Sequence, residues 1–104
     1  MIVYEVNLDV RADIHDAYRA WLAAHVGEIL ALPGFVSAEI FDVFDPAPAE
    51  GRRLLTVCYR VADRASLDRY LAEHAPRLRE DGLRRFGGAF TATRRVLSEV
   101  SGQP

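Results

Sequence analysis

The chain has 104 residues, of which 50% are hydrophobic and 27% are charged, a composition typical of one small globular domain. Its net charge of −2 excludes a general electrostatic attraction to nucleic acid or to anionic membranes. The single cysteine, Cys58, cannot form a disulfide within the chain, and we find neither a signal-peptide pattern nor an apolar run of membrane-spanning length. We therefore expect a cytoplasmic protein, and the use of Arg without any Lys indicates a bacterium with a GC-rich genome.

The charges divide along the chain. Residues 1–50 hold two Arg against nine Asp and Glu, whereas residues 51–104 hold eleven Arg against six acidic residues. If both halves build one sheet, opposite charges can face each other within a subunit or across a dimer. The alternative is a mixed, solvated surface.

The first half of the chain predicts a strand, a helix and a second strand. Residues 2–10 alternate apolar with polar side chains, as half-buried strands do. Asp13 is a predicted helix N-cap, and Pro33 with Gly34 ends that helix. Residues 35–44 predict the second strand. The inner face of the predicted helix carries Ile14, Tyr18, Trp21, Leu22, His25, Ile29 and Leu32. His15 is expected near the solvent side.

The second half of the chain predicts the same three elements again: a strand, a helix and a strand. Residues 53–61 predict a third strand, and Asp63 can cap a second helix. Pro76 predicts a kink or break near Ala75, because proline removes a helical hydrogen bond. A turn at Gly87 leads into a fourth strand over residues 90–97, and residues 101–104 are expected to be a disordered tail. The apolar face of the second helix carries Leu67, Tyr70, Leu71, His74 and Leu78.

The order β-α-β-β-α-β predicts an α+β, ferredoxin-like domain over residues 1–100, with a four-stranded antiparallel sheet and both helices on one face. Its strands hold an apolar set that we expect to exceed what two helices cover: Ile2, Tyr4, Val6, Leu8, Leu55, Val57, Tyr59 and Val61. Two sheets packed face to face would bury the rest, which predicts a homodimeric α/β-barrel.

His25 and His74 are the candidate catalytic residues. Each lies near the centre of a predicted apolar helix face, where an imidazole can act as acid or base near neutral pH. The alternative is two buried structural histidines with hydrogen-bond partners.

The candidate ligand-binding residues are of three kinds. Tyr18, Trp21, Tyr59 and Tyr70 can line an aromatic pocket, although an aromatic stripe at helical spacing also suits a core. Asn7 can donate a hydrogen bond to a ligand if its strand face turns toward the helices. Arg85 belongs, with Arg84, Arg94 and Arg95, to a basic cluster around Gly87 that can hold a phosphate or carboxylate, or stay solvated.

We predict no metal and no cofactor. Ligand spacings such as HxxxH or CxxC are missing, and the remaining possibility is a set of both histidines with Glu5 or Glu39. Cys58 is expected to be buried and inert, and the chain has no phosphate loop or dinucleotide fingerprint.

The segment Leu32-Pro33-Gly34-Phe35 resembles the dimeric α/β-barrel superfamily, which includes antibiotic-biosynthesis monooxygenases, haem-degrading enzymes and stress-responsive barrel proteins. Trp21-x-x-x-His25 and His74-Ala75-Pro76-x-Leu78, followed by Arg85-Phe86-Gly87, are similar to an uncharacterised bacterial family known as a domain of unknown function. The resemblance implies a homodimer with sheets back to back and a small cavity in each subunit between sheet and helices.

The resemblance carries two kinds of chemistry. Haem-degrading members pair a first-strand Asn and a second-helix His with a third-strand Trp. Asn7 and His74 match the first two, but the third strand has Cys58 and Tyr59 where the Trp is expected, which argues against haem breakdown. The cofactor-free oxygenases use a few polar and aromatic side chains, a role that suits Trp21, His25 and Tyr59.

Three functions remain open. The first is a barrel that binds a small apolar or aromatic molecule, without nucleic acid or membrane as a partner. The second is a cofactor-independent enzyme, monooxygenase-like or isomerase-like, with His25 or His74 as general base. The third is a structural dimer without a pocket.

Overall fold

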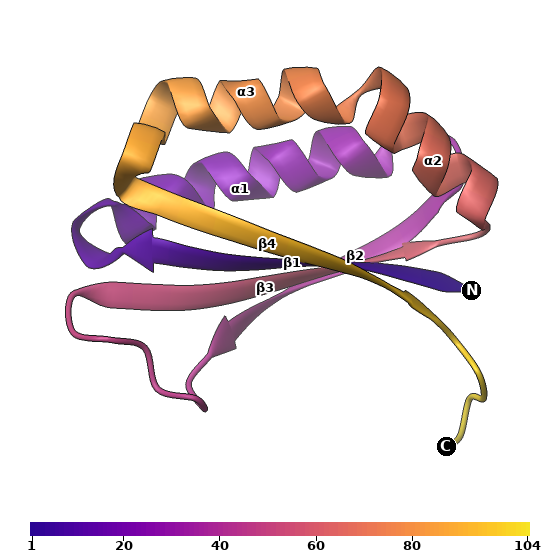
Figure 1. Ribbon diagram of the computed structural model, residues 1–104, viewed down its shortest axis with the longest axis horizontal. Helices are drawn as coiled ribbons and strands as arrows, with labels where there is room; N and C mark the ends of the chain where they lie inside the picture. The colour runs from indigo at the N-terminus through magenta and orange to yellow at the C-terminus, as the bar shows by residue number, and fades with distance from the viewer.

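The computed structural model describes all 104 residues and shows one layer of helices on one face of a sheet (Figure 1). Short 3₁₀ turns, Ala12–Ile14 and Gly87–Ala89, precede α1 and β4. The elements are β1 Ile2–Arg11, α1 His15–Leu30, β2 Phe35–Val43, β3 Arg52–Val61, α2 Arg64–Glu73, α3 Ala75–Phe86 and β4 Phe90–Ser98. This order confirms the predicted ferredoxin-like α+β fold. None of the helices is both long and apolar enough to cross a membrane.

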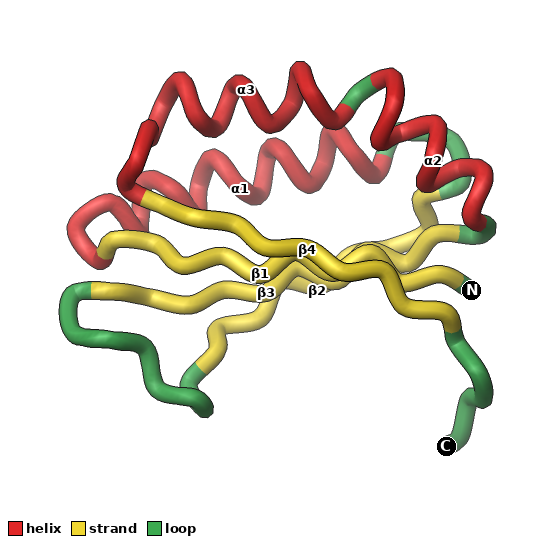
Figure 2. Tube along the Cα trace, viewed as in Figure 1, coloured by secondary structure: helices red, strands yellow, loops and turns green.

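The sheet has four strands in the order β2-β3-β1-β4, and all neighbours are antiparallel (Figure 2). Its register places Tyr4 of β1 opposite Tyr59 of β3 and Val96 of β4. Since successive side chains alternate between faces, this register determines which residues of all four strands face the helices. Those helix-facing positions form the floor of the site described below.

The core lies between the helices and the sheet. Val10, Leu55, Val57 and Val61 of the strands are at most 1% exposed. They pack against helix residues that are also buried: Tyr18, Leu22, Ile29, Leu67, Tyr70 and Leu78. We expected the eight apolar strand residues to exceed what the helices cover and so to require a second sheet. All eight lie on the helix-covered face, because each of the four in β1 stands directly opposite one of the four in β3. That argument for a dimer was therefore wrong: the chain's own helices cover these residues.

The opposite face of the sheet, here called the open face, carries cross-strand charge pairs. Arg95 binds Glu5, Arg52 Nε lies 2.8 Å from Asp9 Oδ1, and Arg60 Nε lies 3.3 Å from Glu39 Oε1. In each pair the acid comes from the first half of the chain and the arginine from the second. Of the two alternatives, charges of the two halves thus pair within the subunit, on a surface that stays partly exposed.

The two predicted helix caps have different outcomes. The Asp63 carboxylate accepts a hydrogen bond from the Ser66 backbone N–H at 2.8 Å, so this cap is confirmed. The Asp13 prediction was wrong, because a 3₁₀ turn precedes α1 and Ile14 occupies the N-cap position. Asp13 instead accepts a hydrogen bond from Arg11 Nε at 2.6 Å.

The same 3₁₀ turn explains a second difference. His15, expected near solvent, is 7% exposed, because this turn sets the direction in which α1 begins. Its Nδ1 lies 3.2 Å from Asp16.

Replacing Asp63 by Ala should lower the free energy of unfolding by about 1 kcal/mol, since the first turn of α2 loses a backbone hydrogen bond. The matched variant Asp13→Ala removes only an exposed ion pair, and its effect should stay below about 0.5 kcal/mol. Urea denaturation of both variants measures the difference. Equal losses would contradict these cap assignments.

Pro76 acts as predicted. The helix is broken between Glu73 and Ala75, with His74 at φ −124° between α2 and α3. Pro76 then occupies the first turn of α3. Backbone N–H groups in a first turn have no partner within the helix, so the missing N–H of proline costs no hydrogen bond there. The break separates α3, which carries part of the site, from α2.

Candidate functional site

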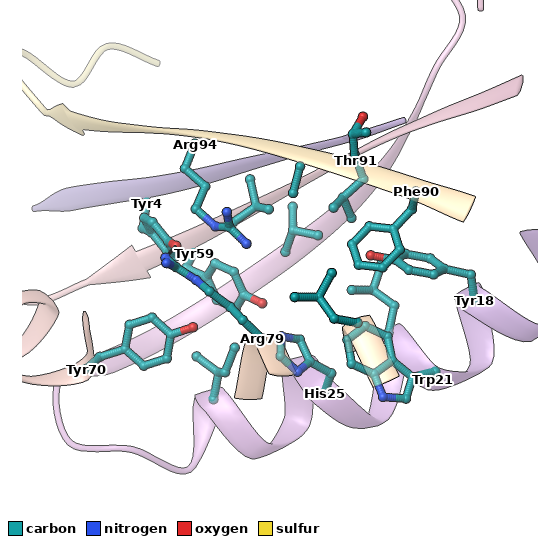
Figure 3. Close-up of a pocket in the computed structure, with 17 residues that line it drawn as sticks. Tyr4, Tyr18, Trp21, His25, Tyr59, Tyr70, Arg79, Phe90, Thr91 and Arg94 are labelled. Atoms are coloured by element: carbon teal, nitrogen blue, oxygen red, sulfur yellow. Dashed lines mark hydrogen bonds between the residues drawn. The ribbon is translucent and has the colours of Figure 1, made fainter. Parts of the chain in front are cut away.

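A cavity of about 360 Å³ lies between the sheet and the helices (Figure 3). Ligand sites of proteins commonly have volumes of about 300–1,000 Å³, so this cavity is large enough for a small ring system. Of its 17 lining residues, 13 are hydrophobic. β1, β3 and β4 supply the floor, while α1, α2 and α3 supply the wall, including Trp21, His25 and Arg79.

His25 lies in this wall with its imidazole available. Its ring stacks on Trp21 with centroids 4.6 Å apart, and no protein group hydrogen-bonds to its ring nitrogens. Burial lowers the pKa of His25 below its ordinary value, although the charges of Glu28 and Asp81 oppose this effect. At neutral pH the ring is therefore uncharged and offers a free lone pair to a molecule in the cavity.

Trp21 is held in place by α3. Its indole Nε1 donates a hydrogen bond to Asp81 Oδ2 at 2.8 Å, and this bond lowers the pKa of the Asp81 carboxyl. A Cβ atom at Gly82 would lie 2.8 Å from the Trp21 ring, so only glycine permits this close approach. The fixed indole in turn orients the His25 ring.

Tyrosines surround the other end of the cavity. Tyr4 and Tyr59 stack with centroids 5.7 Å apart, and Tyr70 meets Tyr4 edge-on at 5.9 Å. Burial raises the pKa of Tyr70 to about 12 and raises the pKa values of Tyr18 and Tyr59 further. The phenols of Tyr18, Tyr59 and Tyr70 are therefore neutral and can donate hydrogen bonds at neutral pH.

Six of the predicted residues line the cavity: Tyr18, Trp21, His25, Tyr59, Tyr70 and Arg94. Asn7 lies on the open face, where its Oδ1 accepts a hydrogen bond from Thr56 at 2.8 Å. The parity of β1 places Asn7 there, because Tyr4, Val6 and Leu8 face the helices. It cannot act with His25 across the sheet.

His74 and Arg85 lie outside the cavity lining. His74 occupies the junction between α2 and α3, and its Nε2 is 4.0 Å from Glu73. The regular helical face ends before it, so an extrapolated helical spacing does not place its ring. Arg85 is exposed, with its Nε 4.0 Å from Asp81.

Four polar or aromatic lining residues were not among the predicted ones: Tyr4, Arg79, Phe90 and Thr91. Tyr4 lies on the same face of β1 as Leu8, and Phe90 lies on the same face of the sheet in β4. The alternation of side chains along the strands was a signal for both. Arg79 follows the buried Leu78 in a helix whose start depends on the Pro76 break, and the sequence has no comparable signal for it.

No group of three or more His, Cys, Asp and Glu side chains lies close enough together to hold a metal ion. Glu5 and Glu39 are on the open face, across the sheet from His25, so the predicted alternative of two histidines with one of these acids is not assembled. Cys58 is on the open face too and is partly exposed, and burial raises the pKa of its thiol. The expected complete burial of Cys58 was wrong.

The burial of His25 should make stability depend on pH. Its pKa is lower in the folded chain than the value of 6.5 in an unfolded one, so the unfolded state binds more protons below pH 6.5. The free energy of unfolding should therefore fall as the pH drops through this window. In His25→Gln this contribution is missing, and urea denaturation from about pH 7 to about pH 5.5 should show a shallower decline. The same decline in both proteins would contradict the burial of His25.

Known structures share this fold. SnoaB, a cofactor-independent oxygenase from Streptomyces nogalater, superposes with a TM-score of 0.71 at 16% identity, over 99% of this chain and 97% of that one. A Deinococcus radiodurans protein assigned to the antibiotic-biosynthesis monooxygenases superposes with a TM-score of 0.69 at 15% identity, over 100% of this chain and 97% of that one. The de novo designed protein Foldit4 superposes with a TM-score of 0.66 at 13% identity, over 94% of this chain and 97% of that one. A designed protein among them illustrates that such likeness establishes the fold alone.

The sequence itself provides the family. No curated protein matches the chain in sequence. The family model described as "Domain of unknown function (DUF4286)" matches residues 1–100. The chain therefore belongs to the DUF4286 family, and it shares its fold with these solved structures.

Proposed function

We propose that this protein is a cofactor-independent enzyme of the oxygenase type, which binds a flat aromatic molecule in the cavity and uses His25 as general base. The observation that carries the proposal is the state of His25: a neutral imidazole without a protein partner, in a wall that is otherwise mostly apolar. His25 is half-buried and its ring nitrogens are not fully buried, so a molecule in the cavity can reach them. The fold shared with SnoaB, a cofactor-independent oxygenase, supports the same class of reaction.

The proposed reaction begins with proton transfer. His25 removes a proton from an acidic C–H group of the bound molecule, and the resulting carbanion reacts with dioxygen to give a peroxide anion. The imidazolium returns its proton to the peroxide, which loses water to leave a carbonyl group. In sum, a CH₂ group and O₂ become C=O and H₂O, so dioxygen is the oxidant and one of its atoms stays in the product.

Anthrone is a suitable probe, because it is flat and tricyclic and its CH₂ group is acidic. Trp21 is the only tryptophan of the chain and lines the cavity, so its fluorescence reports binding directly. We expect anthrone to quench Trp21 and the wild-type protein to accelerate oxygen uptake over the protein-free rate, with anthraquinone as product. Quenching without faster uptake would leave a binding protein and refute the enzyme. The absence of quenching would refute both.

We further propose that the chain forms a homodimer through the open face. Phe41 projects from this face in β2 and is 50% exposed, and Phe44 just beyond the strand is 83% exposed. Such apolar area is costly to leave in water, and a second sheet would cover it. Light scattering should give about twice the mass of the 11.6 kDa chain. Phe41→Asp should shift the protein toward the single-chain mass, and a wild-type monomer would refute the dimer.

A further inference from the structure

The walls of the cavity carry positive charge that the protein does not neutralise. Two lining residues are arginines, Arg79 and Arg94, and none is Asp or Glu. Seven other arginines of the chain pair with a carboxylate, but neither of these two does. The remaining unpaired arginines, Arg19, Arg69, Arg77 and Arg84, are exposed helix residues. Arg94 is exposed as well, and what distinguishes it from these four is that its side chain also borders the cavity.

Arg79 reaches from α3 over the tyrosine end of the cavity (Figure 3). Its Nη2 donates a hydrogen bond to the hydroxyl of Tyr4 at 3.0 Å, and its Nε is buried without a partner. A guanidinium whose one protein partner is a hydroxyl group is poorly compensated for the water it has lost. An anion beside it would restore that compensation.

Arg94 approaches the same space from the sheet. It lies opposite Val6 in the register, so its side chain leaves β4 on the helix side, and Figure 3 shows it reaching toward Tyr59. Its charge lowers the pKa values of Tyr18, Tyr59 and Tyr70, although burial outweighs this effect. The side chain of the next residue, Arg95, lies on the open face and pairs with Glu5. Of two adjacent arginines, the protein thus neutralises one and leaves the other facing the cavity.

A guanidinium prefers a planar carboxylate, which accepts two parallel hydrogen bonds from its fork of N–H donors. The rest of the lining is apolar and aromatic, with Trp21 and Phe90 opposite the two arginines, and suits the flat faces of a ring system (Figure 3). We propose that Arg79 and Arg94 form an anion subsite in the cavity, and that the natural ligand is an aromatic carboxylic acid. The proposal names the substrate class of the site described above and rests on the proposed binding of an aromatic molecule there.

A pair of probes with the same ring isolates the charge: 2-naphthoate and its neutral amide, 2-naphthamide. Isothermal titration calorimetry should show that the wild-type protein binds the naphthoate at least about tenfold more tightly than the amide. Raising the salt concentration from about 50 to about 500 mM should weaken the binding of naphthoate and leave the binding of the amide unchanged, because salt screens the attraction between opposite charges.

Variants assign the effect to the two arginines. In Arg94→Gln and in Arg79→Gln the preference for naphthoate should shrink to about threefold or less, with the affinity for the amide retained. Arg94 makes no side-chain hydrogen bond to Tyr4 and is exposed, so its variant remains informative even if loss of the Tyr4 bond destabilises Arg79→Gln. The matched control Arg95→Gln should keep the full preference.

The outcomes separate this inference from the function on which it rests. Equal affinity of the wild-type protein for both probes, or a preference that survives Arg94→Gln, would overturn the anion subsite while leaving an aromatic cavity. If neither probe binds at millimolar concentration, the proposed binding of aromatic molecules fails together with the subsite.

Discussion

Replacing His25 by Gln should lower the rate of anthrone oxidation by about 10²–10⁴-fold, the usual contribution of a general base. Glutamine is close to histidine in size and remains neutral, so the cavity keeps its shape and loses only the proton acceptor. Anthrone should still quench Trp21 with nearly unchanged affinity, since His25 is one of 17 lining residues. The fall should appear in kcat and not in KM, because the lost interaction belongs to the chemical step.

His74→Gln is the matched control for this result. The substitution is the same, but His74 lies at the junction of α2 and α3, outside the cavity lining. Oxygen uptake by this variant should stay within about twofold of the wild type, whereas a larger loss would point to the helix junction instead. If both variants oxidise anthrone at the wild-type rate, His25 is not the base.

Replacing Gly34 by Ala should be the most destabilising single change in the loop between α1 and β2. Gly34 has φ +84°, which is unfavourable for any residue with a Cβ atom. That atom would lie 2.1 Å from Ser66 Oγ and 2.3 Å from Ser66 Cβ, where the start of α2 is packed against the loop. The backbone strain and the overlap together should lower the free energy of unfolding by about 3 kcal/mol or more.

Gly51→Ala separates the two causes. Gly51 has a similar φ of +76°, but a Cβ atom there would meet nothing within 4 Å. The free energy of unfolding of Gly51→Ala should therefore fall only by the backbone contribution, about 1–2 kcal/mol. Urea denaturation of both variants gives the difference, which measures the contact with Ser66. Equal losses would show that α2 shifts away at little cost and would contradict the close packing at this corner.

The elements of the fold were predictable because local signals marked them. Alternation identified β1 and β3, the Asp63 cap marked the start of α2, and Pro76 marked the break after it. The helical spacing of Tyr18, Trp21 and His25 also placed all three in one wall, since α1 is unbroken. Where an element is regular, its period gives the direction of each side chain.

The errors arose where an element begins, ends or meets another. The 3₁₀ turn before α1 displaced the expected Asp13 cap and buried His15, and the helix junction placed His74 away from the cavity. Alternation divided the β1 residues into two sets, but it did not say which set the helices cover, so Asn7 stayed undecided. The pairing of Arg95 with Glu5, which leaves Arg94 for the cavity, depends on the register between β1 and β4 and has no local signal.

The most direct test of the account is an NMR titration of the three histidine rings, assigned with the Gln variants of His25 and His74, with and without anthrone. We expect anthrone to shift the His25 ring signals and leave those of His15 and His74 unchanged, and the free protein to titrate His25 below its ordinary pKa. Anthrone binding that leaves the His25 signals unmoved would place the ligand elsewhere. The cavity would then not be the site at which this protein acts.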